Sequence, residues 1–174
     1  MDEFYKKSFL NQFTATLDMF ENALRSCPNE LWTASMWKDP AAPVGYSTFW
    51  YVAFHTLFWL DLYLSGSDEG FTPPAPYTLV ELDPQGTLPE RVYSREELLA
   101  YLEYCRQKCK GTILQLTDAL ASRKCIFLWT KGGIPFAELL LDTMRHIQEH
   151  SAQLSMFLGQ AGVTARWIGQ VKGD

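Results

Sequence analysis

The sequence predicts an all-α protein, a four-helix bundle in which a long crossover joins the second helix to the third. Four segments carry apolar residues at intervals of three and four, which is the periodicity of a helix with one buried face. The connection between the second and third segments, residues 65–93, contains several prolines and is far longer than antiparallel neighbours need. The chain has 174 residues, 47% of them apolar, so we expect a single domain, residues 1–174.

The first two helices are predicted over residues 3–25 and 47–64. In the first, phenylalanine and leucine recur with helical spacing, and Pro28 follows its end. The second can be capped by Ser47 or Thr48. It is apolar almost all round, so we expect it to be the most buried helix of the four.

The third helix is predicted over residues 94–122, because Ser94 and Glu97 form a capping box ahead of an apolar stripe. The linker before it determines how it lies beside the second helix. An extended chain covers about 3.3 Å per residue, whereas a helix rises only about 1.5 Å per residue. The linker is therefore long enough to cross the whole bundle, which allows the second and third helices to run parallel.

The fourth helix is predicted to begin at Pro135, since proline suits the first helical position, and to end near Gly159 or Gly162. The segment before it, Lys124–Ile134, contains a short apolar run. It predicts a small strand or hairpin over one end of the bundle.

Composition and charge exclude several classes of protein. The formal net charge is −5 and no cluster of Lys or Arg is present, so nucleic acid is not expected as a partner. The N-terminus lacks the apolar core of a signal peptide. The longest apolar run, residues 49–64, is interrupted by polar residues and is too short for a membrane span. We expect a soluble, cytoplasmic protein without a membrane partner.

The four cysteines do not predict a disulfide framework in a chain of this length. Cys105 and Cys109 are four residues apart on the third helix, which is also a spacing for metal or redox chemistry. Their place on the apolar stripe favours the interpretation that they are small buried core residues.

The three histidines carry the strongest functional signal. His146 and His150 are four residues apart on the fourth helix, which places both imidazoles on one face. A helix offers two nitrogen ligands to one metal ion in this way. His55 lies on the second helix, and metal sites in bundles are built from side chains on facing helices. Together they predict a three-nitrogen site for an ion such as zinc or nickel, with a position open for water or substrate.

Each histidine also has a simpler interpretation. A pair spaced by four is a weak signal alone, and an isolated His55 is most often a core residue bonded to a backbone carbonyl or to Tyr51. Asp142 has the spacing to accept a hydrogen bond from the histidine one turn later, but a solvated charge near the helix start is the favoured interpretation. Asp61 and Glu149 lie on other helix faces and are predicted to be surface groups.

The segment HIQEHSAQLSMFLGQAGV, which begins at His146, resembles the DinB superfamily of helical-bundle proteins, as does the placement of His55 ahead of a long crossover. The resemblance implies a four-helix bundle of up-down-down-up order, whose parallel second and third helices agree with the long linker. It implies a divalent metal, often zinc or nickel, held by His55, His146 and His150. It also implies a homodimer.

Relatives in that family include thiol-dependent S-transferases, so the resemblance implies a small-molecule substrate, with a low-molecular-weight thiol as the candidate. We predict a metal-dependent enzyme of transferase or hydrolase type, in which the ion lowers the pKa of a bound thiol or water. Only Lys131 and Arg145 stand near the expected open end to bind carboxylates of a thiol, and both are equally explained as surface charges. The alternative is a non-catalytic small-molecule-binding or dimeric interaction module, with a structural metal or none.

Overall fold

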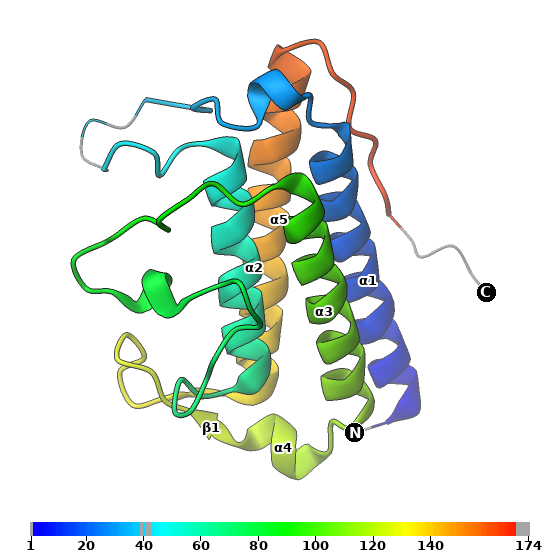
Figure 1. The fold of residues 1–174 in the computed structure, drawn as a ribbon. Coiled ribbons are helices and arrows are strands. Elements are labelled where there is room, and N and C mark those ends of the chain that lie inside the picture. The colour runs from blue at the N-terminus through cyan, green and yellow to red at the C-terminus, as the bar shows by residue number, and fades with distance from the viewer. Residues whose placement is uncertain (1, 39, 41–42, 170–174) are drawn as a thin grey trace.

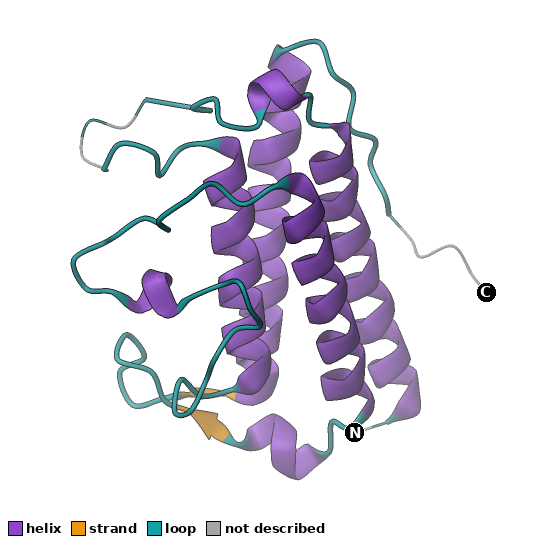
Figure 2. Cartoon of the chain, viewed as in Figure 1, coloured by secondary structure: helices purple, strands orange, loops and turns teal. Residues whose placement is uncertain are grey.

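The computed structural model describes residues 2–38, 40 and 43–169, and it is mostly helical as predicted. The long helices are α1 (Glu3–Ser26), α2 (Phe49–Ser65), α3 (Arg95–Leu114) and α5 (Phe136–Gln160). The short elements are two 3₁₀ turns (Asn29–Leu31 and Leu79–Leu82), α4 (Asp118–Ser122), β1 (Lys124–Cys125) and β2 (Ile134–Pro135). Figure 2 shows the paired strands, which form the predicted hairpin at one end of the helices. Of the predicted domain, residues 1, 39, 41–42 and 170–174 lie outside the described ranges.

Each long helix packs against two others. Helix α1 contacts α3 and α5, and α2 contacts the same two helices. Figure 1 shows that α2 and α3 run in one direction and that α1 and α5 run in the opposite one. The linker between α2 and α3 returns the chain along the helices, as its length predicted. This arrangement puts α2 beside α5, the two helices that carry the histidines.

Helix α2 is buried on nearly all sides, as its composition predicted. The linker contributes to this burial through aromatic rings. Phe71 packs edge-on against Phe58, and Tyr77 and Tyr93 both pack against Phe54. Rings in such contacts stabilise a core beyond the area they bury. The linker is therefore part of the core, and its path past α2 is fixed by packing.

The helix ends follow the predicted capping residues with two differences. The capping box is present, with Ser94 accepting from the amide of Glu97 and the Glu97 carboxylate accepting from the amide of Ser94. Thr48 precedes α2, but its hydroxyl donates to the carbonyl of Gly45 at 2.7 Å instead of capping the helix. Helix α5 begins one residue after Pro135, because Pro135 is still paired within the hairpin.

The third helix is shorter than predicted. Helix α3 ends at Leu114, and α4 follows as a separate turn. Thr117 adopts an extended backbone and its hydroxyl oxygen accepts from the amide of Leu120 at 3.2 Å, so it caps a new helix. Leu116 is fully buried at the break. The prediction of one continuous helix was wrong because it did not weigh the threonine as a helix start.

The prediction that Asp61 is a surface group was also wrong. Its side chain is fully buried between α2 and α3. The hydroxyl of Tyr101 donates to Oδ2 at 3.0 Å, and Nζ of Lys108 donates to Oδ1 at 2.5 Å. Nζ of Lys108 also donates to the hydroxyl of Ser65 at 2.6 Å. A helix covered on most sides has no solvent face for a carboxylate, so this charge is paired inside the protein.

All four cysteines are buried free thiols, which agrees with the core interpretation. Burial raises the pKa of Cys109 to about 12, so this thiol stays protonated at neutral pH. Among the described residues, no helix combines the length and hydropathy needed to cross a membrane.

Candidate metal centre

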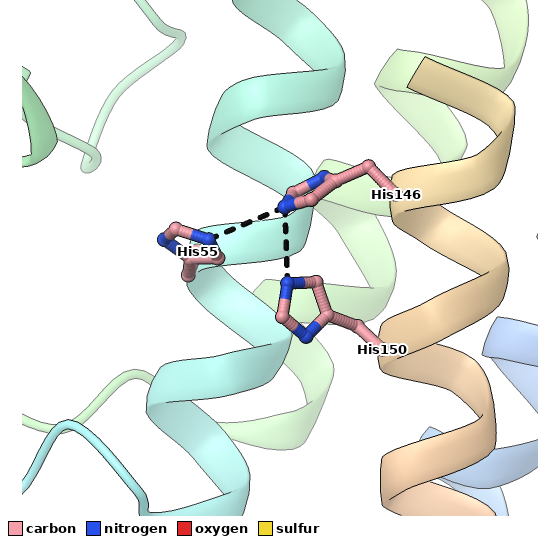
Figure 3. A group of neighbouring side chains, drawn as sticks. All are labelled: His55, His146 and His150. Carbon is pink, nitrogen blue, oxygen red and sulfur yellow. Dashed lines mark hydrogen bonds between the residues drawn. The ribbon is translucent and has the colours of Figure 1, made fainter. Parts of the chain in front are cut away.

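Helices α2 and α5 bring the three histidines together (Figure 3). His55 lies on α2, and His146 and His150 lie one turn apart on α5. Nε2 of His146 lies 3.3 Å from Nε2 of His55 and 3.0 Å from Nε2 of His150. One ligand atom from each ring falls within 4.8 Å of the other two. Every histidine in the chain therefore presents Nε2 to one common point.

The histidines occupy the edge of the buried face of α5. The centre of that face is apolar, with Leu140, Ile147 and Leu154 fully buried. His146 and His150 are only partly buried. The face that carries His146 and His150 thus turns its polar edge toward α2. This position keeps the rings packed by the core and still reachable from one side.

Two of the rings are fixed through Nδ1. Nδ1 of His55 lies 2.7 Å from Oε2 of Glu81, and Nδ1 of His150 lies 2.8 Å from Oε1 of Gln153. Both partners are acceptors, so Nδ1 carries a proton in each ring, and in the neutral imidazole Nε2 then offers a lone pair. Two lone pairs then face Nε2 of His146, and at most one N–H can lie among the three nitrogens. A cation at their centre would satisfy all three.

The spacing of the nitrogens suits a tetrahedral ion. Two histidine nitrogens bound to zinc at about 2.0–2.1 Å lie about 3.3 Å apart when the angle is tetrahedral. Two of the three separations, 3.3 and 3.0 Å, are close to this value, and the third is within 4.8 Å. Three neutral imidazoles are a ligand set for zinc and nickel and leave coordination positions open. The residues present therefore fit a divalent metal.

His146 is the histidine with the fewest hydrogen bonds outside the three-nitrogen group. Its Nδ1 is buried and has no hydrogen-bond partner among the described residues. Asp142, one turn earlier, instead accepts from Arg145 at 3.3 Å and is half exposed, which confirms it as a solvated charge. Burial lowers the pKa of His146 to about 3, and the nearby His150 and His55 contribute in the same direction. The ring is therefore neutral at pH 7, which is the form that binds metal.

Glu81 connects the linker to the histidine group. Its carboxylate is 5% exposed and accepts from Nε1 of Trp59 at 2.9 Å as well as from His55. Burial raises the pKa of this carboxyl, but hydrogen bonds to His55, Tyr51 and Trp59 outweigh it and hold the pKa below the usual value. Glu81 is therefore ionised at neutral pH. It places a negative charge behind His55, as carboxylates commonly do behind metal-bound histidines.

A cavity of about 230 Å³ opens onto the histidines. We call this cavity the aromatic pocket. Its wall consists of Trp37, Tyr46, Ser47, Tyr51, Val52, His55 and His150. Because two of the three histidines line it, water or a substrate could reach an ion held by the rings through this pocket. Lys131 and Arg145, which were considered for binding substrate carboxylates, are not part of the wall.

Comparison with known families agrees with this geometry. Residues 12–154, which include all three histidines, match the DinB superfamily. The chain belongs to the DinB superfamily. The resemblance first drawn from His55 and the last helix is thereby confirmed.

A solved structure supports the same fold for this DinB protein. A DinB-like protein from Bacillus subtilis aligns with 94% of this chain and 99% of its own, with a TM-score of 0.59 and 12% sequence identity. At that identity the likeness concerns the fold alone. No curated protein matches the sequence.

Two residues that hold the rings were not predicted as such. Gln153 lies three residues after His150 on α5, so helical spacing could have indicated the contact. Glu81 lies in the linker, far from any histidine in sequence, and no local pattern indicates its position.

Replacing Glu81 with glutamine is expected to raise the Kd for zinc or nickel about 10- to 100-fold, the usual range for a residue that orients a metal ligand. The side-chain amide of glutamine has no charge, so it accepts a weaker hydrogen bond from the Nδ1–H of His55. The measurement is a competition titration against a chromophoric chelator. Glu90→Gln, an exposed glutamate in the same linker, is the matched control and should leave the Kd unchanged. Equal Kd values for the two variants would exclude Glu81 as a positioning residue.

Proposed function

We propose that this DinB protein is a metal-dependent enzyme, a four-helix bundle of up-down-down-up order that holds one divalent ion through His55, His146 and His150. Zinc and nickel are the ions that suit this ligand set. The observation that carries the proposal is the convergence of three Nε2 atoms, two of them with lone pairs fixed by Glu81 and Gln153. The substrate is a small molecule, and a low-molecular-weight thiol or water is the nucleophile.

A divalent ion in this position lowers the pKa of a bound thiol or water, which makes a nucleophile available at neutral pH. The protein supplies the remaining parts. Glu81 and Gln153 hold the His55 and His150 rings in one orientation. The aromatic pocket leads to the same rings and admits the substrate. These contacts support a transferase or a hydrolase reaction.

A second candidate is a non-catalytic module that binds a small molecule or dimerises, with a structural metal or none. An apolar groove of about 380 Å³ between α1 and α5 favours an interaction role, and its wall includes Tyr5, Phe9, Leu141 and Met144. Tyr5 is 64% exposed and Leu141 is 48% exposed, so the groove offers apolar surface to a second copy of the chain. A homodimer formed through this groove is compatible with both candidates.

Elemental analysis separates the two candidates. The protein is loaded with zinc or nickel, freed of unbound ion and analysed beside a chelator-treated sample. The enzyme proposal predicts about one ion per chain, as in other single-ion histidine sites, and turnover in thiol-transfer or hydrolase assays only in the loaded sample. No bound ion would contradict the metal site. A tightly bound ion without turnover in any of these assays would favour a structural metal.

A further inference from the structure

The aromatic pocket has a composition that restricts what can lie beside the histidines. Trp37 and Tyr46 come from the segment before α2, and Tyr51 and Val52 come from its first turn. The ring centroids of Tyr46 and Tyr51 lie 4.7 Å apart, and those of Tyr51 and His55 lie 6.3 Å apart. The rings therefore form a continuous aromatic wall that ends at a histidine. Such a wall gains most from covering an apolar or aromatic group.

The volume of the pocket indicates the size of that group. An apolar cavity of about 150 Å³ holds one benzene molecule. The aromatic pocket measures about 230 Å³. One aromatic ring with a short substituent therefore fits, and a large peptide-like group does not.

The charges around the pocket disfavour an anion. Among the residues that the structure describes, no lysine or arginine contributes to its wall. Lys38 lines a neighbouring cavity that shares Trp37 and Ser47 with the pocket, but it does not line the pocket itself. The charged group that contacts the wall is the carboxylate of Glu81, whose Oε2 lies 2.7 Å from Nδ1 of His55. A substrate carboxylate placed against this wall, away from an ion on the histidines, would thus lose water without gaining a lysine or arginine partner, which is costly.

We propose that the aromatic pocket selects a neutral aromatic or apolar group of the substrate and disfavours small thiols whose carboxylate would lie against its wall. The inference rests on the proposed function only for the arrival of the reacting atom at the metal. The preference of the pocket itself follows from its wall and holds for the metal-free protein as well.

The test compares two thiols of opposite character, phenylmethanethiol and mercaptoacetate. Binding is followed through the indole N–H resonance of Trp37, assigned with a Trp37→Phe variant, in zinc-loaded and metal-free protein. We expect phenylmethanethiol to shift this resonance in both forms. In metal-free protein, where no ion can hold a carboxylate, its Kd should lie at least about tenfold below that of mercaptoacetate, since only the phenyl ring buries apolar surface. Equal Kd values in metal-free protein, or no shift with phenylmethanethiol, would overturn the inference.

The second part of the test adds a charge to the wall of the pocket. Ser47→Lys puts an ammonium group beside the pocket and should reduce the preference for phenylmethanethiol about tenfold, because mercaptoacetate then gains a cation. Thr33→Lys adds the same charge at an exposed position outside the wall and should leave the preference unchanged. Identical behaviour of the two variants would contradict the inference. The zinc content of the zinc-treated sample is measured in parallel. If that sample holds no zinc and the Trp37 resonance still shifts, the result contradicts the proposed function but supports the pocket.

Discussion

Replacing His146 with alanine is expected to raise the Kd for zinc or nickel about a thousandfold. Structural zinc sites have apparent binding free energies of about 10–16 kcal/mol, or about 4 kcal/mol for each of three or four ligands, which corresponds to a factor of about 1,000 in Kd. Nε2 of His146 lies within 3.3 Å of Nε2 of both His55 and His150, so its loss removes the nitrogen that links the other two.

Thermal unfolding measures this loss without an activity assay. An ion at 100 times its Kd stabilises a folded protein by about 2.7 kcal/mol. For a chain of 174 residues that raises Tm by about 5–10 °C. The wild type should show this rise, and His146→Ala at the same ion concentration should not.

The metal-free state and a surface variant complete the comparison. Without metal, His146→Ala loses only the contacts of Nε2 with His55 and His150, since Nδ1 has no hydrogen-bond partner among the described residues, so its Tm should fall by less than the ion-dependent rise. Glu149→Ala removes an exposed side chain from the same turn of α5 and should keep the full ion-dependent rise. If His146→Ala kept that rise, His146 would not be a ligand.

The histidine group was predictable because the information that places it is short in range. The spacing between His146 and His150 fixes their shared face on any helix. His55 needed one further step, that its helix lies beside the last one, and the length of the linker together with the family resemblance supplied it. The structure brings the three rings within reach of one ion. Whether they bind one is the question that the metal measurements address.

Glu81 was not predictable for the opposite reason. Its contact with His55 depends on the path of the linker, which is set by aromatic rings that pack against α2. No periodicity describes a proline-rich segment, so the sequence pattern does not say which of its acidic residues turns inward. The prediction of one continuous third helix was wrong for a more local reason, because the capping threonine Thr117 and the buried Leu116 outweighed the apolar stripe.

The burial of Asp61 could not be predicted from the sequence for a similar reason. Periodicity within α2 indicates which residues share a face, but it does not say how many neighbouring helices cover that helix. Because α3 and α5 both pack on α2, the side predicted to be solvated is closed. The resulting contact between Asp61 and Lys108 links α2 to α3 from within the core. Its contribution to stability is therefore expected to be large.

Replacing Asp61 with alanine is expected to destabilise the protein by about 3–5 kcal/mol, the usual cost of removing one partner of a buried ion pair. The variant leaves Nζ of Lys108 without its carboxylate and the buried hydroxyl of Tyr101 without its acceptor. At this chain length the loss corresponds to a fall in Tm of roughly 6–20 °C. Urea unfolding of the metal-free protein gives the free energy directly.

Two further variants identify the cause of that loss. Asp142→Ala breaks an exposed pair with Arg145 and should cost at most about 1 kcal/mol. The double variant Asp61→Asn with Lys108→Met should be more stable than Asp61→Ala, because it removes the unpaired cation and keeps an acceptor for Tyr101. Since Asp61 lies away from the three nitrogens, the ion content of each folded chain should not change. A loss below about 1 kcal/mol for Asp61→Ala would mean that the apolar contacts between α2 and α3 suffice without the ion pair.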